Sequence, residues 1–176
     1  MRKIILFIAV SLDGYIADKN GGVGWLHGQG EDSENVDTYS EFIKEIDTVL
    51  MGWNTYHQVV TELSPDEWIY GDLSTYVFTH KRMESIENIC FTAEHPEDLV
   101  KELRNQDGKD IWICGGAELA GQLMRADLID RYYISVIPTI LGEGIRLFGE
   151  MENERKLSLV GTQNYNGIVE LIYERR

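Results

Sequence analysis

The sequence predicts an α/β fold, with a central, mostly parallel mixed sheet, flanking helices and an antiparallel C-terminal hairpin. Apolar runs of strand length alternate along the chain with segments in which apolar residues recur at helical spacing. Near the end, the alternating segments 157–161 and 168–173 flank Asn166-Gly167, a pair typical of a two-residue hairpin turn. The first pattern predicts parallel strands joined by helices, and the second predicts the antiparallel edge.

The composition indicates one folded domain over residues 1–176. Apolar residues make up 43% and aromatic residues 10%, which excludes a disordered chain. The net charge of -14 argues against nucleic acid and anionic membranes as partners. The start Met1-Arg2-Lys3 is like that of a signal peptide, but only seven apolar residues follow, so we expect a buried strand and a cytoplasmic protein. Cys90 and Cys114 lie in strand-like runs and are expected to be buried free thiols.

The first third of the chain predicts a strand, a loop and a helix. Residues 3–10 form a near-continuous apolar run, as in a strand that is buried on both faces. The glycine-rich loop 21–30 is interpreted either as a lid over a ligand or as a surface loop with Trp25 in the core. A helix is expected from about Ser33 to Ile46, because its apolar residues recur on one face. That stripe consists of Tyr39, Phe42, Ile43 and Ile46.

The rest of the chain alternates between predicted strands and helices. Pro96 suits the first turn of a helix over 97–104. A second helix is expected at 117–126, and Pro138 is expected to end a strand. The segment 142–148 is expected to be a glycine-punctuated loop. The predicted strands of this part are 47–51, 75–78, 89–91, 110–114 and 132–137.

Three predicted strands end in glycine or polar residues, and ligands of open α/β sheets bind at the carboxyl ends of strands. The three junctions are Gly52-Trp53-Asn54-Thr55, Thr79-His80-Lys81-Arg82 and Gly115-Gly116-Ala117-Glu118. A strand followed by Gly-Gly and a helix brings backbone N–H groups up to a phosphate. An isolated Gly-Gly is more often a tight turn without a ligand, but three junctions together suit an extended dinucleotide. No G-x-G-x-x-G fingerprint occurs, and the four histidines lack the spacing of metal ligands.

Five segments in order resemble motifs of the dihydrofolate-reductase-like superfamily. They are Ile8-Ala9-Val10-Ser11-Leu12-Asp13-Gly14-Tyr15-Ile16-Ala17, Val49-Leu50-Met51-Gly52-Trp53-Asn54-Thr55-Tyr56, Tyr76-Val77-Phe78-Thr79, Ile113-Cys114-Gly115-Gly116 and Pro138-Thr139-Ile140-Leu141-Gly142-Glu143-Gly144. The chain is more similar to stand-alone relatives of the reductase domain in the bifunctional riboflavin-biosynthesis deaminase/reductase. The resemblance covers about residues 3–173 and implies a three-layer, dihydrofolate-reductase-like fold.

The resemblance implies an NADPH-dependent oxidoreductase, with NADH not excluded, and assigns cofactor-binding residues by position. Ala9 and Ile16 would border the nicotinamide. Gly52, Asn54 and Thr55 would meet the pyrophosphate, while Thr79, His80 and Lys81 would lie near the adenosine end. The phosphate cradle would be completed by Gly115, Gly116, Ala117, Glu118 and Leu119. The peptide bond between Gly115 and Gly116 is also expected to be cis.

The implied reaction is reduction of a small pterin- or pyrimidine-like heterocycle, resembling 5-amino-6-(5-phosphoribosylamino)uracil reductase of riboflavin biosynthesis and dihydrofolate reductase. A carboxylate of the helix at 33–46 would polarise the substrate ring. Asp37 is the chosen catalytic candidate, with Glu34 and Glu41 as alternatives. The competing hypothesis is a non-catalytic nicotinamide-nucleotide-binding protein that keeps the fold. The relatives also suggest a homodimer.

Two departures from the family pattern affect cofactor and substrate. Trp53 stands where family members often have an arginine for the 2′-phosphate of NADPH, so Lys81 and Arg82 are expected to take that role. No lysine or arginine lies between Lys44 and Lys81, and residues 31–72 hold eleven acids and one base. A substrate with an anionic tail would need cations there. We therefore expect a neutral or cationic heterocycle.

Overall fold

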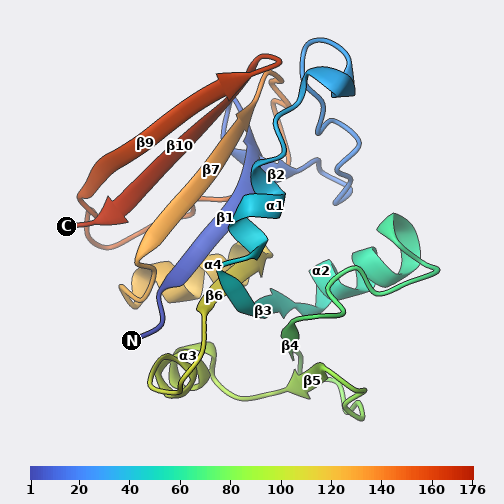
Figure 1. Cartoon of the computed structure of the whole chain (residues 1–176), viewed down its shortest axis with the longest axis vertical. Coiled ribbons are helices and arrows are strands. Elements are labelled where there is room, and N and C mark those ends of the chain that lie inside the picture. Colours follow the sequence, from blue (N-terminus) through green and yellow to red (C-terminus); the bar gives the residue numbers. More distant parts are fainter.

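The computed structural model, which describes residues 1–176, contains one eight-stranded sheet in the order β5-β4-β3-β6-β1-β7-β10-β9 (Figure 1). The strands are β1 (Ile4–Ser11), β2 (Tyr15–Ala17), β3 (Ile46–Gly52), β4 (Ser74–Phe78), β5 (Ile89–Thr92), β6 (Asp110–Gly115), β7 (Arg131–Ile137), β8 (Ile145–Arg146), β9 (Leu157–Tyr165) and β10 (Ile168–Arg175). The helices are α1 (Thr38–Ile43), α2 (Trp53–Gln58), α3 (Pro96–Arg104) and α4 (Ala117–Arg125). A 3-10 turn (Asp32–Glu34) precedes α1, and a π-helical turn (Val59–Leu63) continues α2. None of the helices is long and apolar enough to cross a membrane.

The sheet topology confirms the predicted fold class. Strands β5, β4, β3, β6, β1 and β7 run parallel, whereas β10 and β9 pair antiparallel at one edge. Most of the parallel connections run through helices, whereas β4 and β5 are joined by a loop. The carboxyl ends of six strands consequently meet at one edge of the sheet.

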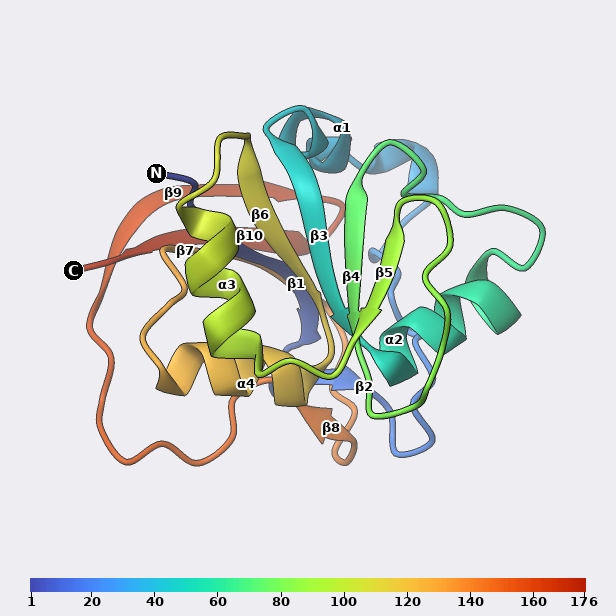
Figure 2. The same ribbon diagram turned by 90° about the horizontal axis from the view of Figure 1, so that it is seen from below.

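Two apolar cores lie on opposite faces of the sheet, because successive side chains of a strand point to opposite sides. Ile4 and Leu6 of β1 pack into the core that α3 and α4 cover. Ile5 and Phe7 face the other core, to which α1 contributes Phe42 and α2 contributes Tyr56. Figure 2 shows α3 and α4 together on one side and α1 on the other. This arrangement gives three layers.

The helix expected over 33–46 is wrong in its extent. Only Thr38–Ile43 is α-helical, Asn35 is extended, and Ile46 already belongs to β3. Asp37 caps the short helix by accepting a hydrogen bond from the Ser40 N–H (2.9 Å). The break has a tertiary cause, because the Asn166 amide donates to Asn35 Oδ1 (2.8 Å) and holds the chain against the hairpin turn. A local apolar pattern does not report such a contact.

Most other elements match the prediction within one or two residues. The hairpin turns at Asn166 and Gly167, whose φ values of 45° and 75° suit a two-residue turn with positive φ at both positions. Its strands are longer than expected, and the predicted loop 142–148 contains β8, which pairs with β2. The Gly115–Gly116 peptide bond is cis, as expected. Both cysteines are unpaired and half-buried.

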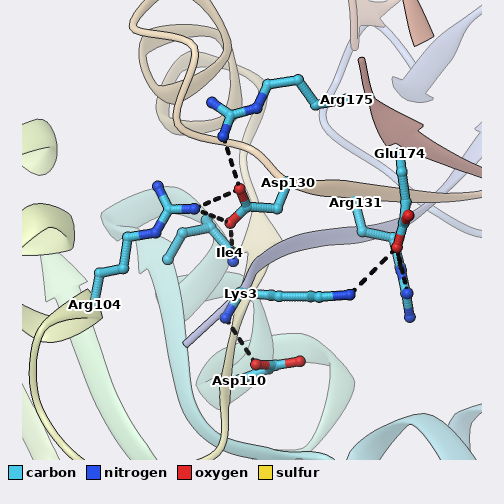
Figure 3. Close-up of polar contacts among 8 residues, drawn as sticks. All are labelled: Lys3, Ile4, Arg104, Asp110, Asp130, Arg131, Glu174 and Arg175. Carbon is cyan, nitrogen blue, oxygen red and sulfur yellow. Dashed lines mark hydrogen bonds and ion pairs between the residues drawn. The ribbon is translucent and has the colours of Figure 1, made fainter. Parts of the chain in front are cut away.

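Ion pairs hold the strands together at the edge where β1 and β7 begin (Figure 3). Asp130 accepts hydrogen bonds from the Ile4 N–H (2.9 Å), from Arg104 and from Arg175 (3.2 Å). Glu174 of β10 forms ion pairs with Lys3, just before β1, and with Arg131 of β7. Asp110 of β6 accepts a hydrogen bond from the Lys3 N–H (2.7 Å). The cluster therefore stabilises the edge opposite the carboxyl ends of the parallel strands.

Candidate functional site

The carboxyl ends of β3 and β6 bring two of the predicted glycine junctions together. Met51 pairs with Gly115, and Gly52 and Gly116 are the residues that precede α2 and α4. A Cβ added at Gly115 would lie 3.3 Å from Thr55 Oγ1, and one at Gly52 would lie 3.9 Å from the Gly116 nitrogen. Two segments 60 or more residues apart thus form one surface, in which Gly115 is buried and Gly52 and Gly116 are half-buried. Its glycines let a ligand approach the main chain.

The N-terminus of α4 is the part of this surface best suited to an anion. The first turn of an α-helix leaves N–H groups without intrahelical partners and carries a partial positive charge. Gly116 supplies no side-chain cap, so the N–H groups of Ala117, Glu118 and Leu119 have no acceptor from the capping residue. Gly115 has a φ of 149°, a conformation that favours glycine. Ala117 is half-buried, Glu118 is exposed and Leu119 packs into the core.

The third predicted junction contacts the junction after β3 through a cation–π interaction. Lys81 Nζ lies 3.9 Å from the centroid of the Trp53 ring, and the Lys81 N–H donates to Thr79 Oγ1 (3.1 Å). An ammonium over an indole face is favourable at an exposed site by about 0.5–1 kcal/mol. His80 and Lys81 are exposed just past the end of β4, whose Phe78 pairs with Gly52. A positive charge therefore lies over Trp53.

The ladder between β1 and β6 ends well before the carboxyl ends of these strands. Pairing between them covers only Ile4–Leu6 and Ile111–Ile113, whereas β1 pairs with β7 as far as Ser11. The Trp112 indole donates to the Phe7 carbonyl (3.0 Å) at the point where the ladder ends. Ala9 therefore lies in a stretch of β1 whose β6 side has no strand partner. The region beside Gly115 and Ala9 thus has main-chain groups outside the ladder.

Ile16 and the turn before it are held by a carboxylate that sequence reasoning did not single out. Asp13 accepts hydrogen bonds from Ser11 Oγ (2.6 Å) and from the N–H groups of Leu141 (3.1 Å) and Gly142 (2.7 Å). The Ser11 hydroxyl and these main-chain donors lower the pKa of Asp13 to about 2. Asp13 thereby ties the turn between β1 and β2 to the segment before β8. The Asp-Gly pair marked the turn, but nothing local indicated its partner.

The structure places the three helix carboxylates at the surface. Asp37 caps α1, and its hydrogen bonds with Ser40 hold its pKa below the ordinary value. Glu41 forms an ion pair with Lys44 (2.6 Å), and Glu34 lies in the 3-10 turn. All three are exposed. A role for Asp37 at the substrate stays a prediction. In that role its carboxylate would have to cap α1 and contact the ligand at the same time.

A buried carboxylate of β10 contacts the first residue of α1, and the sequence prediction missed it. Glu170 is only 1% exposed. Its Oε1 accepts from Tyr165 OH (2.7 Å), Thr38 Oγ1 (2.8 Å) and, more weakly, Ser135 Oγ (3.4 Å), while Gln163 donates to Oε2. No lysine, arginine or histidine is among these partners. The sequence did contain a signal for this residue, since Glu170 occupies the inward position between Ile168 and Ile172, where an apolar residue is expected.

Glu170 belongs to the same row of side chains as Ala9. Across the sheet, Ala9 pairs with Ser135, Ser135 with Glu170, and Glu170 with Gln163. Paired residues of neighbouring strands point to the same face. This is the face of α1, because Phe7, two residues before Ala9, stacks on Phe42 with ring centroids 4.4 Å apart.

The three-layer sheet, the cis Gly-Gly junction and the antiparallel edge together define a reductase-like domain with a dihydrofolate-reductase-like fold. The chain belongs to the RibD C-terminal domain family, whose model matches residues 2–169. It is 41% identical to the uncharacterized protein YwjB of Bacillus subtilis over 99% of this chain and 98% of that protein. The uncharacterized protein YyaP of the same organism is 32% identical, over 98% of this chain and 94% of its own length.

Proteins of riboflavin biosynthesis are among the more distant relatives. A putative riboflavin biosynthesis protein from Shewanella sp. PV-4 superimposes with a TM-score of 0.85 at 30% identity, covering 99% of both chains. The riboflavin biosynthesis protein RibD of Haemophilus influenzae is 22% identical over 90% of this chain, which spans 53% of that protein. The deaminase/reductase of Thermotoga maritima shares the fold at a TM-score of 0.71 and 15% identity, covering 99% of this chain and 57% of that one.

Proposed function

We propose that the protein is an NADPH-dependent reductase of a small pterin- or pyrimidine-like heterocycle. The observation that carries the proposal is the single glycine-lined surface formed by Gly52, Thr55 and Gly115-Gly116 at the N-terminus of α4. Membership of the RibD C-terminal domain family supports the same reading of the fold. A phosphate needs N–H donors and an approach free of side chains, and this surface offers both.

The residues present fit a nicotinamide dinucleotide in three parts. Gly116 and the first amides of α4 would hold the pyrophosphate together with Thr55. Glycine suits this role because a Cβ at Gly115 or Gly116 would occupy the space beside the Thr55 hydroxyl. Lys81, held over Trp53, would meet the adenosine end and its 2′-phosphate. Ala9 would face the nicotinamide. NADPH, when bound, supplies the hydride; the protein positions the two rings and excludes water.

Charge around the expected substrate region favours a ring without an anionic tail. Lys44, the only base between residues 31 and 72, is already paired with Glu41. Arg146, a base elsewhere in the fold, lies over the Tyr15 ring (4.8 Å to the centroid). An anionic tail placed among the carboxylates of this region would therefore meet like charges without a free cation to offset them.

A fluorescence titration with NADPH followed by an oxidation assay tests the proposal. The wild-type chain is expected to bind NADPH and to oxidise it with at least one heterocycle of a broad panel. Binding without oxidation of NADPH by any compound would support the competing hypothesis of a non-catalytic nucleotide-binding protein. Absence of NADPH binding to the folded chain would contradict both hypotheses.

A further inference from the structure

The hydrogen bonds around Glu170 have a defined direction. The Glu170 carboxylate oxygens are the acceptors in these contacts, so each hydroxyl that contacts them is the donor. Thr38 and Tyr165 both lie within 2.8 Å of the same carboxylate oxygen, and Ser135 lies at 3.4 Å from it. Burial and the contact with Glu170 raise the pKa of Tyr165 to about 12, so its proton remains in place at neutral pH. Each hydroxyl has one hydrogen, and it is used in the hydrogen bond to Glu170.

The same contacts leave the two half-buried hydroxyls of the cluster as acceptors. Glu170 is buried, whereas Thr38 and Ser135 are half-buried. A hydroxyl that has donated its hydrogen keeps lone pairs and can only accept. Ser135 is the cross-strand neighbour of Ala9, and Thr38 is the first residue of α1. The face beside Ala9 thus presents hydroxyl oxygens that require N–H or O–H donors.

The partners of Glu170 favour the same class of ligand. Its contacts are three hydroxyls and one amide, and no basic side chain is among them. A buried acceptor group without a cationic partner favours a ligand that brings N–H donors. The exposed carboxylates Asp37 and Glu41 on and beside α1 act in the same direction.

We propose that Glu170 is a positioning residue that fixes the hydrogen-bond direction of Thr38 and Ser135, and so selects heterocycles that present amino or ring N–H donors. The inference deepens the proposed function, because it assumes that the substrate ring lies beside the nicotinamide at Ala9. Ligand chemistry is the discriminating feature: a ring edge with donors pairs with these oxygens, whereas a ring edge with acceptors leaves them facing lone pairs.

A matched pair of probes tests the selection directly. 2,4-Diaminopyrimidine presents amino donors, and 2,4-dimethoxypyrimidine has the same ring and substituent positions with acceptors alone. Binding of each to the full chain is measured by calorimetry, with and without NADPH. The wild type is expected to bind the diamino compound at least about tenfold more tightly, the equivalent of one net hydrogen bond.

Glu170→Met removes the acceptor at similar length, so the hydroxyl hydrogens become free to donate outward. The selectivity ratio is expected to fall to about one. Glu174→Met is the matched control, because Glu174 lies on the same face of β10 but pairs with Lys3 and Arg131 at the far end of the strand. It is expected to change the melting temperature and to leave the ratio unchanged. A merely structural role for Glu170 would lower stability without changing the ratio.

Two further variants test the inference even if the Glu170→Met protein does not fold. Thr38→Val and Ser135→Ala remove the acceptor oxygens at the half-buried layer, and each is expected to reduce the selectivity ratio while the chain stays folded. An unchanged ratio in folded Thr38→Val and Ser135→Ala proteins overturns the inference, as does a wild type that binds neither probe or prefers the dimethoxy compound. Selectivity that depends on Glu170 in a protein that binds no NADPH would support the inference and refute the proposed cofactor.

Discussion

Replacing Gly116 with valine adds a side chain at the point where β6 passes into α4. A Cβ at this position would lie 3.5 Å from Thr55 Oγ1, an ordinary contact, and Gly116 has a φ of -87°, which any residue adopts. The Cβ therefore fits, but the two γ-methyl groups extend into the space in front of the first amides of α4. Each lost N–H contact to a charged phosphate costs about 1.5–3 kcal/mol, so two lost contacts predict a decrease in NADPH affinity of at least about a hundredfold.

The assay is a fluorescence titration of the Gly116→Val protein with NADPH, beside a thermal melt that checks for a cooperative transition. Gly149→Val is the control, because a Cβ at Gly149 meets nothing within 4 Å and the residue lies outside the proposed site. The control is expected to keep the wild-type affinity. Unchanged NADPH affinity in a folded Gly116→Val protein would refute the assignment of the phosphate site to this turn.

Three other predictions concern cofactor choice, acid stability and substrate charge. Lys81→Ala combined with Arg82→Ala should weaken NADPH by about tenfold and leave NADH nearly unchanged in parallel titrations, because the pair would lose contacts with the 2′-phosphate alone; an equal loss for both cofactors would contradict this role. Asp13 has a folded pKa of about 2 against an ordinary value of 3.8, so its stabilising effect is complete above that ordinary value and is lost as the pH falls toward 2. Asp13→Asn should therefore flatten the pH dependence of the melting temperature over this interval, and melts that keep the wild-type slope would disprove the assignment. Steady-state kinetics should show poor turnover of dihydrofolate and of the ribosylaminopyrimidine phosphate beside a tail-free dihydropterin; efficient reduction of either anionic compound, with the tail-free one inert, would show that the charge argument is wrong.

The alternation of apolar runs was sufficient to predict the sheet and its antiparallel edge, because burial of one or both faces imposes a period on each strand. The junctions after β3, β4 and β6 were also predictable as one site, since parallel strands bring their carboxyl ends to the same edge. The contact of Thr55 with Gly115 is a consequence of that topology.

The parts that the sequence did not reveal depend on contacts between distant segments. The helix at 33–46 is interrupted because Asn166 bonds to Asn35. Glu170 was not predicted because the resemblance placed the substrate carboxylate on that helix, although a glutamate at an inward strand position is itself a signal. Asp13 likewise has its main-chain partners near residue 141, and its local Asp-Gly pattern indicates only a turn.

A co-crystal structure of the full chain with NADPH tests the central claim most directly. The proposal predicts the pyrophosphate at the N-terminus of α4 beside Gly115, Gly116 and Thr55, the 2′-phosphate near Lys81, and the nicotinamide next to Ala9. A cofactor bound elsewhere, or one whose phosphates avoid the turn between β6 and α4, would contradict it.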